Sequence, residues 1–205
     1  MGDNTKKLVD FIEALNGFEY VLNSDGSYEH VGAIIVDGIL QAGLKYETVV
    51  KPRVLSVLEK YPNNTTTSSF ITVCKEQGIK NIISWKNDKK PNLIMLLLSF
   101  LQSEQVETCQ QFSTWLEQEN NILKLRSIKG IGPKTIDYLK ILLGKETVAV
   151  DIHLKRFVQM AGIELSNYDE IKTVITETAN HLNISPSQLD HSIWKYMAER
   201  EELCN

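Results

Sequence analysis

Residues 125–157 read LRSIKGIGPKTIDYLKILLGKETVAVDIHLKRF, and two of their side chains could do chemistry. Lys134 follows a Gly-Ile-Gly-Pro turn and lies in the first turn of a helix that we expect over residues 133–143. The positive end of the helix dipole disfavours a protonated amine at this position, which favours the neutral, nucleophilic form of the lysine. Lys134 is therefore a candidate nucleophile. The alternative is a solvated lysine that contacts a phosphate.

The turn before Lys134 carries Gly130 and Gly132, and it joins a helix expected over residues 121–127 to the one that begins at Pro133. Glycine lets the backbone turn sharply and come close to a partner, and proline suits the first position of a helix. The amides of the turn and the positive end of the second helix form an anion site, for which a DNA phosphate is the natural ligand. The alternative is a plain helical hairpin in which the glycines only allow close packing.

Asp151 follows the apolar run TVAV and precedes the helical pattern IHLKRFVQMAGI, so we expect it to cap that helix. A carboxylate held by backbone amides is stabilised in its ionised form, and it can stabilise a developing cation or accept a proton. His153 lies in the same first turn. It is either a second phosphate contact or an exposed histidine without a role.

Composition limits the class of protein. The 205 residues carry a formal net charge of -4, so no global basic field points to nucleic acid, although a local positive groove is compatible with this value. The cysteines, Cys74, Cys109 and Cys204, form no CxxC pair and have no histidine at ligand spacing. This pattern indicates unpaired thiols in a reducing compartment and no zinc or iron–sulfur site.

The chain is expected to be all-α, with roughly ten helices, because apolar residues recur at helical spacing along most of it. The opening residues lack the apolar core of a signal peptide, and the stretch LIMLLLSFL is about half the length of a membrane span. The sequence therefore predicts a cytoplasmic protein with no membrane partner.

Taken together, LRSIKGIGPKT and VAVDIHLKRF resemble the signature of the helix-hairpin-helix (HhH-GPD) DNA glycosylases, the superfamily of endonuclease III and 8-oxoguanine DNA glycosylase. In that family a Gly-hydrophobic-Gly hairpin is followed by a Val-Asp-x-His, and here Lys134 and Asp151 are 17 residues apart. The resemblance implies a two-lobed all-α fold with a cleft between the lobes. One lobe would be a helical barrel, residues 31–139, with the hairpin at 121–143; the other would combine residues 1–30 and 140–205.

The resemblance also implies a reaction on double-stranded DNA that carries a damaged base or an abasic site. Asp151 falls on the catalytic aspartate, which stabilises the oxocarbenium character of the sugar. Lys134 falls on the lysine of the bifunctional members, which attacks C1′, expels the base, forms a Schiff base and cuts the strand by β-elimination. The protein would act as a monomer, with the target base flipped into the cleft.

Further roles follow from the resemblance alone. Turn amides near Gly130 and Gly132 would grip a phosphate, with His153 as a second contact, and Gln41 lies where some relatives insert a residue into the DNA gap. The alternative for Gln41 is an ordinary polar residue at a helix end. Family hairpins often hold a potassium or sodium ion through backbone carbonyls, here those of Arg126, Ile128 and Ile131.

The chain departs from endonuclease III because the four-cysteine loop is absent, so we expect no iron–sulfur cluster and no required cofactor. Asp190 and Trp194 could help to recognise the base, but their four-residue spacing is equally typical of a core tryptophan beside a capping or surface acid. The excised base stays open among oxidised pyrimidines, 8-oxoguanine and alkylpurines. Two other functions stay open as well: a monofunctional glycosylase for alkylated or mismatched bases, and a hairpin module that binds DNA without catalysis.

Overall fold

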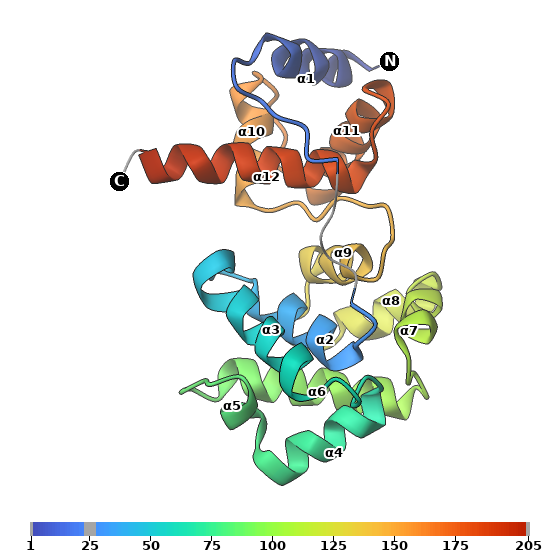
Figure 1. The fold of residues 1–205 in the computed structure, drawn as a ribbon. Helices are drawn as coiled ribbons and strands as arrows, with labels where there is room; N and C mark the ends of the chain where they lie inside the picture. The colour runs from blue at the N-terminus through green and yellow to red at the C-terminus, as the bar shows by residue number, and fades with distance from the viewer. Residues whose placement is uncertain (1, 23–27, 204–205) are drawn as a thin grey trace. The chain divides into compact units, whose positions relative to one another are not determined.

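The computed structural model describes residues 2–22 and 28–203 (Figure 1), and this part of the chain is helical without a β-strand. The expected all-α class is therefore confirmed. The chain forms two compact units, Ser27–Lys145 and Met1–Gly26 with Glu146–Asn205. The first unit begins four residues before and ends six residues after the lobe predicted at 31–139. Cys204 lies outside the described residues.

The unit Ser27–Lys145 is built around one buried helix. Every residue of α2 is buried, and α2 packs against α3, α4, α6 and α9. The run VGAIIVDGIL explains this burial, because a helix that is apolar all round must be covered on every side. The elements of this unit are α2 (Val31–Leu40), η1 (Tyr46–Val50), α3 (Lys51–Lys60), α4 (Thr67–Gln77), α5 (Ile79–Ile82), α6 (Lys89–Ser103), α7 (Cys109–Trp115), α8 (Glu119–Arg126) and α9 (Pro133–Leu142).

A buried histidine caps the start of α2. The Nδ1 atom of His30 accepts from the amide of Ala33 at 3.1 Å, and its Nε2 atom lies 3.1 Å from the carbonyl of Tyr61. Burial lowers the pKa of His30, which favours the neutral ring. A neutral ring that accepts at Nδ1 donates from Nε2, so one imidazole serves both contacts.

Two glycines let neighbouring helices approach α2 closely. A Cβ atom on Gly32 would lie 2.4 Å from the ring of Phe70, and one on Gly38 would lie 2.6 Å from Cδ2 of Leu139. Real Cβ atoms are not found at such distances. Phe70 of α4 and Leu139 of α9 therefore occupy the space that a side chain at Gly32 or Gly38 would need.

The second unit consists of α1 (Asp3–Ala14), α10 (Ile152–Met160), α11 (Tyr168–His181) and α12 (Pro186–Leu203). Helix α1 packs on α11, and α12 packs on both α10 and α11. The apolar run TVAV before Asp151 has no regular secondary structure and pairs with no strand in the described residues. Its Ala149 amide instead donates to Asp190 Oδ2 at 2.6 Å.

Among residues 2–22 and 28–203, no helix combines the length and the apolar character that a bilayer crossing requires.

Replacing Gly38 by alanine tests the packing of α2. In most helices this change stabilises by about 0.5–1 kcal/mol. Here we expect Gly38→Ala to destabilise by about 1–3 kcal/mol in urea unfolding, because the new methyl group collides with Leu139. In a Leu139→Ala background the penalty should disappear. An equal cost in both backgrounds would contradict this packing.

Candidate functional site

The hairpin turn between α8 and α9 has the sharp backbone turn that the sequence suggested, and Gly130 makes it. The amide of Ile131 donates to the carbonyl of Ile128 at 3.0 Å, and Gly130 has a φ of 104°. A side chain at Gly130 would be strained by this φ, and its Cβ would lie 3.0 Å from Leu93 on α6. Gly130 is therefore needed for the turn and for its packing against α6.

Gly132 has a different role, because neither its conformation nor its packing requires glycine. Its φ is -106° and its ψ is 178°, which is extended backbone open to any residue. Apart from its two neighbours in the chain, a Cβ atom on it would meet no heavy atom of the described residues within 4 Å. Gly132 is the N-cap of α9 and has no side chain with which to cap it, and Pro133 follows it. The start of this helix thus presents open space to an anion.

Lysines gather beside this helix start. Lys134 is half-buried in the first turn of α9, and Lys90, near the start of α6, is close enough for the two charges to interact. The pKa of Lys90 is lowered first by burial and then by the charges of Lys89 and Lys134. The Nζ atom of Lys90 donates to the carbonyls of Ile39 and Ala42 at the end of α2. These two bonds hold the ammonium group of Lys90 near those of Lys89 and Lys134, although the charges repel one another.

The two units differ in charge. Ser27–Lys145 contains 15 Lys and Arg residues against 11 Asp and Glu residues, a formal net charge of +4. The other unit contains 7 against 15, a net charge of -8. An open hollow on that unit is lined by carboxylates that would repel phosphate, those of Asp3, Asp169, Glu170 and Glu177. The hairpin therefore lies on a basic body within an acidic chain.

Asp151 caps α10, as the sequence predicted. Its Oδ1 atom accepts from the amides of His153 at 2.8 Å and Leu154 at 3.0 Å. These two bonds fix the carboxylate at the positive end of the helix, where its negative charge is favourable. The side chain is half-buried.

The ring of His153 packs edge-on against Trp194, with ring centroids 6.5 Å apart at an interplanar angle of 86°. Trp194 also contacts His191, at 6.1 Å between centroids. Both His153 and Trp194 are half-buried. Asp190 holds the backbone of Ala149, which gives it a structural role. The aromatic group beside the Asp151 cap is a feature that the sequence did not reveal.

Gln41 lies at the C-terminal end of α2, in the same unit as Lys134. Its Nε2 atom is buried and has no hydrogen-bond partner in the structure. Insertion of this side chain into DNA would require it to swing outward. Its role in the DNA gap stays a prediction.

The carbonyl of Ile128, one of the three proposed for a monovalent cation, accepts from the Ile131 amide. A carbonyl has a second lone pair, so this bond leaves room for an ion, and the cation site stays a prediction. Across residues 2–22 and 28–203, His, Cys, Asp and Glu side chains nowhere gather in a group that could hold a metal ion.

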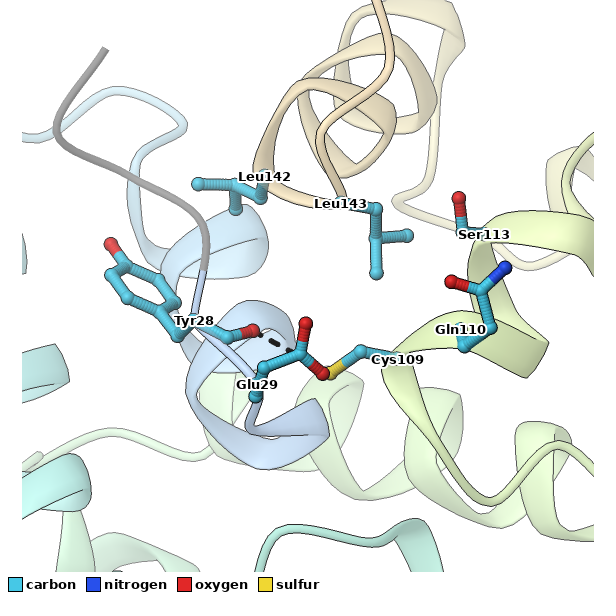
Figure 2. A pocket seen from close by; sticks show the side chains of 7 residues that line it. All are labelled: Tyr28, Glu29, Cys109, Gln110, Ser113, Leu142 and Leu143. Carbon is cyan, nitrogen blue, oxygen red and sulfur yellow. Dashed lines mark hydrogen bonds between the residues drawn. The ribbon is translucent and has the colours of Figure 1, made fainter.

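Two buried cysteines are not nucleophiles. Burial raises the pKa of Cys74 to about 12 and that of Cys109 to about 11, so both are protonated thiols at neutral pH. Figure 2 shows Cys109 directed at the main-chain carbonyl of Tyr28, to which its Sγ atom donates at 3.6 Å. The pocket beside this contact has a volume of ≈ 40 Å³, which is room for a few water molecules and not for a nucleobase.

The predicted residues divide between the two units. Gln41, Gly130, Gly132 and Lys134 belong to Ser27–Lys145, whereas Asp151 and His153 belong to the other unit. Convergence of Lys134 and Asp151 on one sugar stays a prediction. Lys89 and Lys90 were not among the predicted site residues, although their position shortly before the apolar run LIMLLLSFL was a visible signal.

The fold occurs in a known enzyme. The crystal structure of the H. pylori 3-methyladenine DNA glycosylase (MagIII) bound to 1,N6-ethenoadenine matches 97% of this chain and 99% of its own, with a TM-score of 0.65 and 18% sequence identity. The chain thus has the fold of a helix-hairpin-helix DNA glycosylase. In a comparison of sequences, no curated protein matches it. The family model described as "Domain of unknown function (DUF8548)" matches residues 6–198. Because this match spans nearly the whole sequence, the chain belongs to the DUF8548 family.

Proposed function

We propose that this protein is a base-excision-repair DNA glycosylase with AP-lyase activity. The observation that carries the proposal is the open, glycine-capped start of α9, with Lys134 in its first turn, on a fold that a DNA glycosylase shares over nearly its full length. The protein acts as a monomer in the cytoplasm, on double-stranded DNA that contains a damaged base or an abasic site.

DNA binds to the hairpin unit through its phosphates. The turn at Gly132 admits a phosphate oxygen to the backbone amides, and the lysines on α6 and α9 supply the positive field. The charge of +4 on this unit and of -8 on the other places most of the phosphate contacts on the hairpin unit. His153 adds a phosphate contact from the second unit.

Catalysis uses Lys134 and Asp151. The Nζ atom of Lys134 attacks C1′ of the flipped nucleotide, and the base leaves with the electrons of the glycosidic bond. Asp151, held at the start of α10 by two amides, stabilises the positive charge that develops on the sugar. Ring opening gives a Schiff base between Nζ and C1′, and loss of the proton at C2′ expels the 3′ phosphate.

A second candidate is a monofunctional glycosylase for alkylated bases, in which water attacks C1′ and Lys134 only contacts a phosphate. The 3-methyladenine DNA glycosylase that shares the fold, with its bound 1,N6-ethenoadenine, favours this class of base. Duplexes that each carry one lesion, either 3-methyladenine, 1,N6-ethenoadenine, an oxidised pyrimidine or 8-oxoguanine, identify the substrate by base release.

Lys134→Ala should abolish the covalent adduct that the protein forms with an abasic-site duplex in the presence of borohydride, because no Schiff base can form without the amine. The control is Lys129→Ala, which removes an exposed lysine of the same turn and should leave trapping intact at saturating DNA. If the wild type releases a base but traps no DNA, the monofunctional alternative is correct.

Asp151→Asn should lower the rate of base excision by about a hundredfold or more, since the amide cannot stabilise the sugar cation. Asparagine still caps the helix, so the free energy of unfolding should fall by at most about 1 kcal/mol. The matched control is Asn167→Ala, which removes a cap of the same geometry from α11. It should destabilise without slowing a single turnover. Equal rates for Asp151→Asn and the wild type would remove the aspartate from the mechanism.

Gly132→Ala and Gly130→Ala should separate DNA binding from stability. A methyl group on Gly132 fits the protein but blocks the phosphate, so the dissociation constant for DNA should rise about tenfold or more at unchanged Tm. Gly130→Ala should instead cost about 1–2 kcal/mol of stability, because its φ of 104° is strained for alanine. Unchanged DNA affinity in Gly132→Ala would place the phosphate elsewhere.

A further inference from the structure

A buried carboxylate in α2 has no part in the reaction proposed above. Asp37 is fully buried and is the sole ionisable residue of α2. Its Oδ2 atom accepts from the hydroxyls of Tyr28 at 2.7 Å and Tyr46 at 3.3 Å, and its Oδ1 atom accepts from that of Tyr138 at 3.1 Å. We call these four residues the Asp37 cluster. Burial of a carboxylate is costly unless it is hydrogen-bonded, and here three donors compensate for the lost water.

The cluster joins three separate segments to α2. Tyr28 precedes the helix, Tyr46 begins the π-helical turn η1, and Tyr138 lies on α9. Phenylalanine at these positions with an apolar residue in place of Asp37 would fill the same space, and such replacements are often neutral or stabilising. Stability alone therefore does not account for the cluster. What a carboxylate adds is direction, because a hydrogen bond prefers a nearly linear donor and an acceptor approach close to the plane of the carboxylate.

Each oxygen of Asp37 holds a different part of the unit. Oδ2 accepts from the two tyrosines next to α2 in sequence, whereas Oδ1 accepts from a tyrosine on α9. Tyr138 is four residues after Lys134, so the two side chains lie on the same face of α9, about 6 Å apart along its axis. The hydrogen bond from Tyr138 thus lies one helical turn C-terminal to Lys134, the candidate nucleophile.

The same helix crossing contains a close apolar contact. Gly38 follows Asp37 and Leu139 follows Tyr138, and a Cβ on Gly38 would lie 2.6 Å from Leu139 Cδ2. Apolar packing fixes the distance between two helices, but the hydrophobic effect behind it is non-directional. A directional hydrogen bond beside the contact sets the rotation of α9. At the end of α2, Lys90, whose charge interacts with that of Lys134, adds bonds to the carbonyls of Ile39 and Ala42.

We propose that Asp37 is a positioning residue: through the hydroxyl of Tyr138 it fixes the rotation of α9 on α2 and thereby the direction of Lys134. The consequence for catalysis rests on the proposed function, whereas the positioning itself does not. Burial raises the pKa of Tyr28, Tyr46 and Tyr138, so the hydroxyls remain donors at any working pH. Burial also raises the pKa of Asp37, and the three hydroxyls partly oppose this.

The test compares two variants, each of which lacks one tyrosine hydroxyl that donates to the carboxylate of Asp37. Tyr138→Phe removes the bond that holds α9, and Tyr28→Phe removes the shorter bond to the other carboxylate oxygen. Tyr28 is a suitable control because its main chain is also held by Cys109 (Figure 2). Both variants keep the ring, so both should fold, and their Tm values measure the general cost of losing one hydroxyl.

We expect Tyr138→Phe to speed amide hydrogen exchange in residues 128–136 by about fivefold or more, the effect of one lost hydrogen bond, and to slow borohydride trapping at saturating DNA by a similar factor. Tyr28→Phe should lower Tm at least as much as Tyr138→Phe does. It should change neither the hydrogen exchange of residues 128–136 nor the rate of trapping. DNA affinity should be the same in both variants.

The proposal is overturned if the two variants change hairpin exchange equally, or if neither does, since the cluster would then serve stability alone. Its failure is distinct from that of the proposed function. A wild-type protein that traps no abasic DNA, with exchange still faster in Tyr138→Phe only, overturns the lyase activity and supports the positioning.

Discussion

The close approach of α2 and α9 at Gly38 is the constraint on which the hairpin unit depends. Because α2 is buried on every side, the helices that cover it take their positions from it. Leu139 occupies the space where a Cβ of residue 38 would be, so the second helix of the hairpin comes closer than a side chain would allow. Packing on α2 thus sets the position of α9, and the turn before α9 is positioned with it. Within the turn, Gly130 packs against Leu93 on α6, whereas Gly132 has free space where a Cβ would be.

Local patterns were enough to predict the helices and the caps. Helical spacing of apolar residues gave the all-α class, and the position of Asp151 between an apolar run and a helix gave its cap. The cap of α4 has an equally local origin, because Thr66 forms a capping box with Ser69, three residues later. The π-helical turn Tyr46–Val50 was not predicted, because its i to i+5 hydrogen bonds have no counterpart in side-chain spacing.

The contacts that the sequence did not predict join residues far apart in the chain. Tyr138 and Asp37 are separated by 101 positions, and Lys90 lies 51 positions from the carbonyl of Ile39 that it binds. Periodicity identifies a buried face but not which polar side chains on it meet. An aspartate within VGAIIVDGIL was a visible signal, since a carboxylate in such a helix requires donors, yet the sequence does not identify which tyrosines supply them.

The separation of charge between the two units bears on how such a protein would search a chromosome. Long residence on undamaged DNA requires many phosphate contacts, and its strength falls steeply with salt. A chain with a net charge of -4, and with its excess of lysine and arginine confined to one body, has few such contacts to offer. Its residence time on intact DNA would be short. Formation of a specific complex would depend on how easily the target nucleotide flips out of the duplex.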